Sequence, residues 1–245
     1  MITAILFDLD GTLVQTEILK AISYAKAAIE LRPSSVTQKA VIEAFKMVVG
    51  LSRDEVVRYL MDFFDLEAAA RSRMADLQAD TPEEVYVQLR LREYDAILSN
   101  TQILYDHLCT HNVELLKWSH HQGYRTGLAT MSHAEQANRV LAILQLTSYL
   151  EVVAARDDVV QGKPDPEMYH LVASKLGVSP EQCLVIEDSA TGVKAALAAG
   201  MGCIVVTTDM TRSSVHESKL LDPRWIVDDP ACVEAVVAVY LKEHA

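Results

Sequence analysis

The sequence is poor in the residues that bend or cross-link a chain. Its 245 residues include only nine glycines, seven prolines and four cysteines, while half of all residues are hydrophobic. Such a composition excludes a disordered chain and leaves enough apolar material for one large domain or two smaller ones. The four cysteines form no Cys-x-x-Cys pair, and Cys183 and Cys203 stand inside apolar runs. We therefore expect buried thiols in a reducing compartment.

Positive charge and long apolar runs are also scarce. Lys and Arg number 22 against 34 Asp and Glu, which gives a net charge of −12. This excess of negative charge argues against a nucleic-acid partner, although a metal ion and a lysine could reverse the sign locally for a small anionic substrate. No stretch approaches the length of a membrane span, and the start of the chain lacks the basic and apolar regions of a signal peptide. The sequence predicts a cytoplasmic, soluble protein with no membrane partner.

An acidic turn follows the first apolar segment. Residues 4–7 read as a strand buried on both faces, and the chain continues as Asp8-Leu9-Asp10-Gly11-Thr12. Side chains two apart on an extended chain point the same way, so Asp8 and Asp10 can converge. Two close carboxylates repel each other unless a cation or a shared proton lies between them. The turn therefore predicts a site for a hard metal and an oxyanion, and the alternative is an ordinary acidic surface turn.

Residues 18–100 show helical spacing and no convincing strand. One helix is broken by residues 32–35, a second is expected to end at Gly50, and Ser52 and Thr81 each begin a further helix with a capping-box pattern. An all-helical insert that directly follows an acidic strand end indicates a lid.

From about residue 100 strands and helices alternate. Strands are expected at 125–130, 150–155, 183–186, 202–207 and, more briefly, 225–227. Alternation of this kind predicts an α/β fold, a Rossmann-like parallel sheet with helices on both faces, plus the inserted all-α cap. We place the core domain at residues 1–16 and 97–245 and the cap at 17–96. Ligands of such sheets bind beyond the carboxyl ends of the strands.

Several polar residues stand at these strand ends. The Thr130 hydroxyl and the backbone N–H of Met131 suit a phosphate oxygen, although this segment can also be a plain helix entry capped by Ser132. Lys163 lies in a Gly-Lys-Pro loop, where it is either solvated or turned toward the same strand ends. Glu187 and Asp188 close another apolar strand, and Asp188 is the natural third carboxylate for Mg²⁺.

Together these segments resemble the haloacid dehalogenase superfamily, on the branch with a helical cap that includes phosphoglycolate phosphatase and β-phosphoglucomutase. The resemblance rests on four motifs that stand in family order and cover most of the chain. They are Asp8-Leu9-Asp10-Gly11-Thr12, Leu128-Ala129-Thr130-Met131-Ser132, Gly162-Lys163-Pro164-Asp165-Pro166 and Glu187-Asp188-Ser189-Ala190-Thr191-Gly192.

The resemblance implies a role for each motif residue. Asp8 would be the nucleophile that becomes an aspartyl-phosphate, and Asp10 would protonate the leaving alcohol and later activate water. Mg²⁺ would be held by Asp8, Asp188 and the backbone carbonyl of Asp10. Thr130 and Lys163 would hold the phosphoryl group, while Glu187 would act from behind the metal ligands or through a water. A carboxylate at position 10 favours phosphoryl transfer over dehalogenation.

The sequence departs from the family pattern at the entrance to the cap. Gln15 replaces a frequent acid, and Lys20 stands where β-phosphoglucomutase has a histidine, whereas Arg53 matches an arginine of that mutase or is an ordinary helix residue. The expected function is a Mg²⁺-dependent phosphatase acting on a small phosphorylated metabolite, either a sugar phosphate or phosphoglycolate, in a monomer. A phosphomutase, a non-catalytic regulatory protein on the same fold, and a phosphonate hydrolase using Lys20 or Lys46 remain as alternatives.

Overall fold

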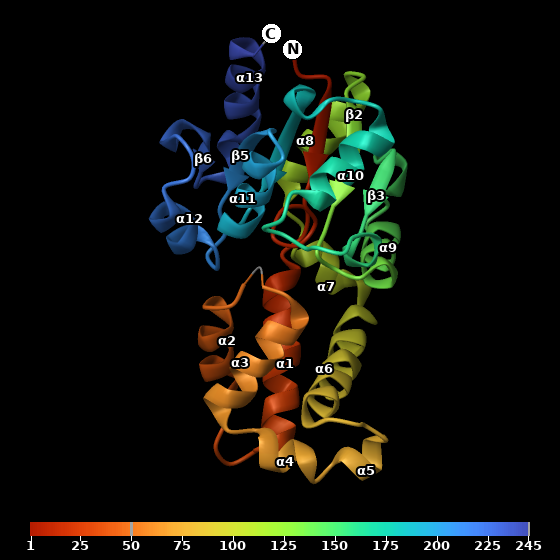
Figure 1. Ribbon diagram of the computed structural model, residues 1–245, viewed down its shortest axis with the longest axis vertical. Coiled ribbons are helices and arrows are strands. Elements are labelled where there is room, and N and C mark those ends of the chain that lie inside the picture. Colours follow the sequence, from red (N-terminus) through yellow and green to blue (C-terminus); the bar gives the residue numbers. More distant parts are fainter. Residues whose placement is uncertain (50, 245) are drawn as a thin grey trace. The chain divides into compact units, whose positions relative to one another are not determined.

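The computed structural model describes residues 1–49 and 51–244 of the chain. They form two compact units, one made of residues 1–15 and 104–245 and the other of residues 16–103. The first is called the core unit below and the second the helical unit (Figure 1). The predicted cap, residues 17–96, falls within the helical unit.

A six-stranded parallel sheet forms the centre of the core unit, as predicted. Its strand order is β3-β2-β1-β4-β5-β6 (Figure 1). The first strand of the chain is therefore central and fully buried. The strands are β1 Ala4–Phe7, β2 Arg125–Ala129, β3 Val152–Ala154, β4 Cys183–Glu187, β5 Gly202–Val206 and β6 Ile226–Val227.

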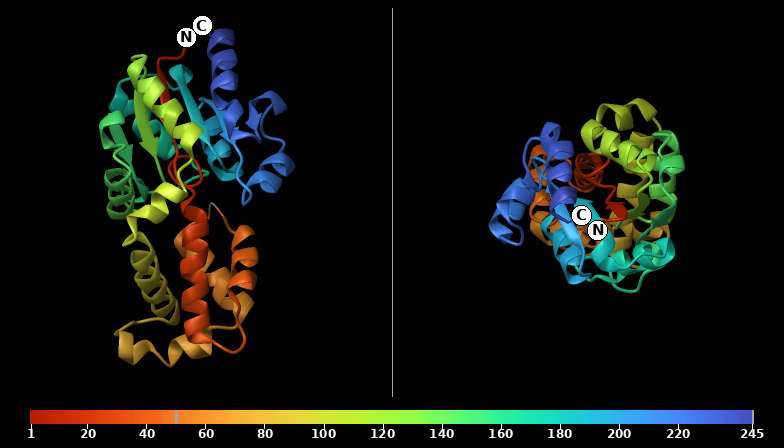
Figure 2. Two further views of the ribbon diagram at one scale, coloured as in Figure 1. Left: turned by 180° about the vertical axis from the view of Figure 1, so that it is seen from behind. Right: turned by 90° about the horizontal axis from the view of Figure 1, so that it is seen from above.

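Helices cover both faces of the sheet, which confirms the predicted fold class. One face carries α8 (Thr110–His121) and α13 (Val233–Glu243), and the other carries α10 (Glu167–Leu176) and α11 (Ala190–Ala198) (Figures 1 and 2). Two further helices, α9 (Ala134–Ile143) and α12 (Arg212–Ser218), follow β2 and β5, and α7 (Thr101–Asp106) joins the two units. Short 3₁₀ turns occupy residues 147–149, 156–158, 180–182, 223–225 and 230–232.

The register of the central strands brings three strand ends together. Phe7, the last residue of β1, pairs with Leu128 of β2 on one side and with Ile186 of β4 on the other. The residues that follow these positions in the three strands therefore lie at the same edge of the sheet. This alignment places the first, second and fourth sequence motifs next to one another.

A glycine lets α10 approach the sheet closely. A Cβ atom on Gly127 of β2 would lie 2.5 Å from Val172 Cγ1 of α10, far inside normal contact distance. The missing side chain therefore sets how deeply α10 packs against β2.

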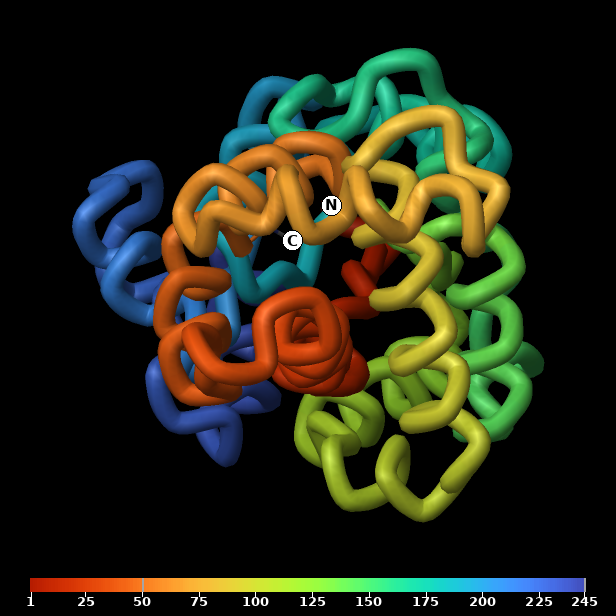
Figure 3. The backbone as a smooth tube through the Cα atoms, turned by 90° about the horizontal axis from the view of Figure 1, so that it is seen from below, coloured from red at the N-terminus to blue at the C-terminus, as the bar shows by residue number. Residues whose placement is uncertain are grey.

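The helical unit contains no strand among its described residues. Its helices are α1 Thr16–Leu31, α2 Gln38–Lys46, α3 Arg53–Phe64, α4 Glu67–Arg71, α5 Met74–Leu77 and α6 Pro82–Leu98. The long helices α1 and α6 pack against each other, and α2 packs against α1; Figure 3 views α1 nearly end-on.

The predicted helix starts in this unit are present. The Ser52 hydroxyl accepts the Glu55 N–H, and the Glu55 carboxylate accepts the Ser52 N–H, which is a complete capping box. The Thr81 hydroxyl likewise accepts the Glu84 N–H at the start of α6, with Pro82 in the first turn. The Glu84 carboxylate, however, accepts the N–H of Asp80 and not that of Thr81, so the predicted capping box is incomplete. Helix α2 ends at Lys46, and Gly50, its predicted C-terminal cap, lies outside the described residues.

The structure bears on the predicted state of the cysteines and on the expected absence of membrane spans. All four cysteines are free thiols, and Cys183 and Cys203 are buried as expected. Within residues 1–49 and 51–244, every helix is too short or too polar to cross a membrane.

Candidate active site

Backbone hydrogen bonds continue the sheet by one residue into the motifs. The N–H of Asp8 donates to Ile186 O at 3.1 Å, and the N–H of Thr130 donates to Ala154 O at 3.0 Å. Asp8 and Thr130 are both buried beyond the carboxyl ends of their strands, as is Asp188 beyond β4. Strand pairing thus sets the backbone positions of Asp8 and Thr130.

Lys163 reaches this edge from the loop between β3 and α10. Its Nζ donates to Asp8 Oδ1 at 2.7 Å, to Glu187 Oε1 at 2.6 Å and to the carbonyl of Ala129 at 2.9 Å. An ammonium group has three hydrogens, so these three acceptors use all of them. Of the two interpretations open from the sequence, the structure therefore shows Lys163 turned toward the strand ends, buried among carboxylates.

Glu187 carries more hydrogen bonds than the sequence indicates. Its Oε1 accepts from Lys163 and from the phenol of Tyr169, both at 2.6 Å, and its Oε2 accepts from the N–H of Asp188 at 3.1 Å and from Ser189. A Cβ on Gly192 would lie 1.9 Å from Glu187 Oε1, so glycine is required beside this carboxylate. Tyr169 was missed by sequence reasoning, which named no residue in the interior of this helix.

The Asp10 carboxylate accepts hydrogen bonds from two residues of the second motif. Its Oδ2 accepts from Ser132 Oγ at 2.6 Å and from Thr130 Oγ1 at 3.2 Å, and Thr130 Oγ1 in turn accepts the Ser132 N–H at 3.0 Å. The carboxylates of Asp8 and Asp10 therefore have different partners: Asp8 contacts Lys163, and Asp10 contacts hydroxyl groups.

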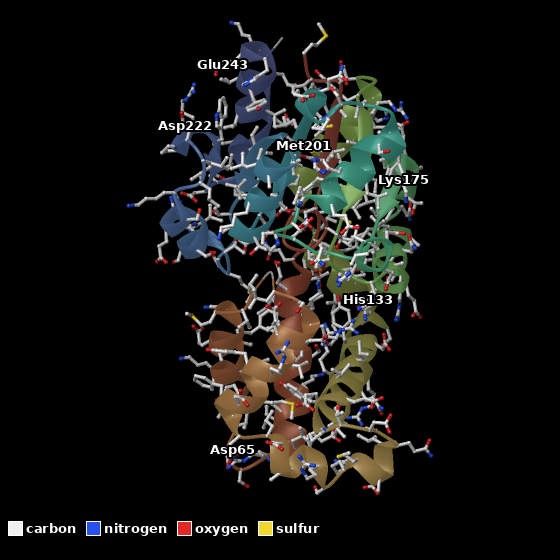
Figure 4. The ribbon with its side chains drawn as sticks, in the orientation of Figure 1. Asp65, His133, Lys175, Met201, Asp222 and Glu243 are labelled. Carbon is white, nitrogen blue, oxygen red and sulfur yellow. The ribbon has the colours of Figure 1, made fainter. Side chains whose placement is uncertain are left out.

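The interpretation of Ser132 as a helix cap is wrong. Helix α9 begins at Ala134, and its N-cap residue, His133 (labelled in Figure 4), makes no side-chain cap bond. Instead, Asp157, from the turn after β3, accepts the N–H of Ala134 at 2.7 Å. Ser132 lies one residue before the N-cap position, and its hydroxyl donates to Asp10.

Met131 supports the lysine loop through its side chain. Its Sδ accepts the backbone N–H of Lys163 at 3.3 Å, and a Cβ on Gly162 would lie 2.3 Å from Met131 Cε. The phosphate contact expected of the Met131 backbone N–H stays a prediction, and its thioether has the further role of holding the Lys163 loop in place.

Three buried carboxylates could hold a metal ion. Asp8, Glu187 and Asp188 each offer an oxygen, and these oxygens lie within 4.8 Å of one another. Burial, partly offset by the Lys163 ammonium, raises the pKa of Asp8 to about 7. Burial alone would lower the pKa of Lys163, but the Asp8 and Glu187 carboxylates outweigh it and raise that pKa. An all-oxygen donor set with excess negative charge fits a hard divalent cation such as Mg²⁺.

Two further contacts expected from the sequence, one by Asp10 and one by Arg53, stay predictions. The Asp10 carboxylate is turned toward Thr130 and Ser132, so its expected metal contact through the backbone carbonyl stays a prediction. Arg53 begins α3 in the helical unit, and its expected contact with substrate likewise stays a prediction.

A separate cavity of about 230 Å³ occurs in the core unit. Its wall comes from Gly11, Gln15, Pro230, residues 108–112 at the start of α8 and residues 206–208 at the end of β5. It shares Gly11 with the first motif, but its described lining includes none of the carboxylates or the lysine that form the cluster above. This cavity therefore lacks the carboxylates and the lysine that a phosphoryl-transfer site requires.

The model of the haloacid dehalogenase-like hydrolase family matches residues 2–200. The chain belongs to this family. Membership confirms the resemblance found in the sequence and identifies the protein as a hydrolase of the haloacid dehalogenase type.

Relatives within the family are named for phosphate-ester substrates. Phosphoglycolate phosphatase of Salmonella typhi is 30% identical over 211 residues, which cover 84% of this chain and 81% of that protein. A phosphorylated carbohydrates phosphatase of Thermotoga maritima is 28% identical over 198 residues, covering 81% of this chain and 82% of that one. The crystal structure of a β-phosphoglucomutase from Clostridium difficile superposes with a TM-score of 0.73 over 98% of this chain and 99% of that chain; at 20% identity this likeness shows the fold alone.

Proposed function

We propose that this haloacid dehalogenase-type hydrolase is a Mg²⁺-dependent phosphatase of small phosphorylated metabolites, of the sugar phosphate or phosphoglycolate type. The observation that carries the proposal is the buried contact of Asp8 with Lys163, at a strand end shared with Glu187 and Asp188. A carboxylate in this position combines a nucleophilic oxygen with a fixed cation that can stabilise the charge of a transferring phosphoryl group. The names of the phosphatase relatives support the same reaction class.

In the proposed first step an Asp8 carboxylate oxygen attacks phosphorus while the bond from phosphorus to the ester oxygen breaks. Asp10 gives its proton to that leaving oxygen, so the alcohol departs neutral and Asp8 carries the phosphoryl group. In the second step Asp10 takes a proton from water, and the water oxygen attacks phosphorus. Inorganic phosphate leaves, and the Asp8 carboxylate is restored.

The surrounding residues hold the phosphoryl oxygens during both steps. The Thr130 hydroxyl and the Met131 N–H would donate to them, and Lys163 would do so after giving up one of its three present hydrogen bonds. Asp8, Asp188 and the Asp10 carbonyl would hold Mg²⁺. The ion, when bound, supplies positive charge that offsets repulsion between the phosphate and the carboxylates. In this structure Asp10 Oδ2 accepts hydrogen bonds from Thr130 and Ser132, which orient its carboxyl group.

Residues 17–96 are proposed to act as a lid that excludes bulk water and supplies substrate contacts, Arg53 among them. We also propose that the protein works as a cytoplasmic monomer without a nucleic-acid or membrane partner. The negative net charge of −12 is consistent with the proposed absence of a nucleic-acid partner.

Phosphate release from a panel of phosphorylated metabolites, measured with Mg²⁺ and with EDTA, tests the proposal. We expect metal-dependent release, and we expect Asp8→Asn to reduce it by more than about a thousandfold because the nucleophile is lost. Asp209→Asn is the matched control, since it makes the same change at an exposed loop position of the core unit. Release that survives Asp8→Asn would show that another group is the nucleophile.

A phosphomutase is the second candidate, favoured by the identity of residue 53 and weakened by Gln15 and Lys20. It predicts conversion of β-glucose 1-phosphate, with a bisphosphate primer, to a product that keeps its phosphate. The same panel therefore separates the two activities, and a protein inactive in both assays would fit the non-catalytic alternative.

A further inference from the structure

One oxygen of Glu187 is shared between two donors. Lys163 Nζ and the Tyr169 hydroxyl both donate to Oε1, each at 2.6 Å, and all three residues are buried. Asp188 and Ser189 donate to the other oxygen of this carboxylate, Oε2. The phenol thus competes directly with the lysine for one buried negative charge.

This competition affects where the lysine lies. A carboxylate oxygen that accepts a second strong hydrogen bond attracts its first donor less, because part of its charge is already compensated. Without the phenol, Lys163 would be the remaining side-chain donor to Oε1, and its ammonium would move toward Glu187. Its contact with Asp8, now 2.7 Å, would lengthen as a result.

Tyr169 also contacts the lysine through its ring. The ammonium nitrogen lies 4.9 Å from the ring centroid, within the range of a cation–π interaction. The ring and the hydroxyl therefore limit the lysine from two directions. The close approach of α10 to β2 at Gly127 keeps Tyr169 in place, since α10 carries both Tyr169 and the contacting Val172.

We propose that Tyr169 is a positioning residue for phosphoryl transfer: by holding Glu187, it keeps the Lys163 ammonium available to Asp8 and to the phosphoryl group. The proposal rests on the phosphatase function proposed above. It assigns the phenol no contact with substrate, so its removal acts on the rate of the chemical step more than on substrate binding.

The test compares Tyr169→Phe with wild type in hydrolysis of p-nitrophenyl phosphate with Mg²⁺. We expect kcat to fall by about tenfold or more, while KM changes by less than about threefold. Tyr240→Phe is the matched control, because it removes the same hydroxyl from another buried tyrosine of the core unit, one that packs at Gly202, where β5 begins. An unchanged kcat in Tyr169→Phe, or an equal loss of kcat in the control, would overturn the proposal.

A second variant separates the hydroxyl from the packing of the ring. Protein carrying 3-fluorotyrosine at position 169 retains the donor, and we expect it to keep wild-type kcat. If it loses as much activity as Tyr169→Phe, disturbed packing is the cause and the proposal is wrong.

A crystal structure of Tyr169→Phe provides a readout that needs no turnover. We expect the distance from Lys163 Nζ to Asp8 Oδ1 to exceed the 2.7 Å of the native site. An unchanged distance would overturn the positioning role whatever the kinetics. Should wild-type protein release no phosphate at all, the proposed function fails, and this distance still decides the contribution of Tyr169 to the geometry of the site.

Discussion

At the scale of single residues, Glu187 is the hydrogen-bonding centre of the site. Sequence resemblance assigns it an indirect part in metal binding, but the structure surrounds its two oxygens with donors from Lys163, Tyr169, Asp188 and Ser189. Its position therefore fixes that of the lysine, and through the lysine that of the Asp8 side chain.

The glycine beside Glu187 allows this dependence to be tested. Gly192→Ala would place a methyl group 1.9 Å from Glu187 Oε1, so the carboxylate must move. We expect phosphatase activity to fall at least tenfold, and we expect the free energy of unfolding to fall by about 1–3 kcal/mol, the usual cost of overpacking. Thr191→Ala, at the preceding position of α11, is the control for a small change in the same helix turn.

Activity measurements and denaturant unfolding of both variants decide the outcome. Wild-type activity in Gly192→Ala would mean that Glu187 can move without consequence, which would contradict its central place in the site.

The sequence identified some residues of the site and missed others for physical reasons. Asp8, Thr130 and Asp188 were found because each follows an apolar strand, and parallel strands end at one edge. Tyr169 was not found because a buried phenol in an amphipathic helix looks like any core residue until its partner is known. The partner Glu187 lies 18 positions away in the chain, and no local periodicity links the two.

At the scale of secondary structure elements, the start of α9 shows how a helix can be capped from a distant turn. Asp157 accepts the Ala134 N–H and also contacts His133 Nδ1 at 2.7 Å. The Ala134 N–H, followed by the His133 contact, lowers the pKa of the Asp157 carboxyl. The side chain thus joins α9 to the segment that follows β3.

Asp157→Ala should therefore destabilise the protein by about 1 kcal/mol at neutral pH, the typical value of a lost helix cap. Because the pKa of Asp157 is lower in the folded state, its contribution is present above the unfolded pKa near 4 and is lost as pH falls through the folded value. The difference in unfolding free energy between wild type and variant should hence shrink on acidification from pH 6 to below about 3.

Urea unfolding at several pH values measures this difference, and Asp209→Ala is a control at an exposed acidic turn position of the core unit. A difference that stays constant with pH would indicate that lost packing, rather than the charged cap, explains the effect.

The strands that follow residue 100 were predicted even where they are short, whereas the shortest helices were missed. The five strands predicted after residue 100 are all present, including the two-residue β6, although β3 covers only Val152–Ala154 of the expected 150–155. The helices α4, α5 and α7 were not predicted, because four to six residues are too few to display a helical pattern. Tertiary packing, which the sequence alone does not reveal, determines such short helices.

At the scale of the whole molecule, the helical unit is an insertion whose two ends meet. Val14 and Leu108 form an antiparallel bridge, Gln15 N donates to His107 O at 2.9 Å, and Cys109 N donates to Leu13 O at 3.0 Å. The chain therefore leaves the core unit and returns to it at neighbouring positions.

This arrangement predicts that the core unit folds without the insertion. Replacement of residues 16–103 by a short Gly/Ser linker should leave the cooperative unfolding of the core intact, because ends that already touch are closed at low entropic cost. We expect metabolite hydrolysis to fall by at least about a hundredfold, since the proposed lid and its substrate contacts are gone.

Circular dichroism, calorimetry and phosphate release test the shortened protein. Loss of cooperative unfolding would show that the core depends on the helical unit for stability. Retention of full activity toward the metabolite would remove the proposed role of the lid.

The pairing of β1 with both neighbours has a consequence for how this chain can change over time. Substitutions within Ala4–Phe7 alter packing. Deletion or insertion of a single residue there would instead shift the pairing register of β1 with both β2 and β4. Such a one-residue register shift would turn each side chain of β1 to the opposite face of the sheet and would move Asp8 away from Lys163. Loops distant from this edge can gain or lose residues without that penalty. Mutational drift in this protein should therefore leave the number of residues in segment 4–10 unchanged, while length variation accumulates in its outer turns.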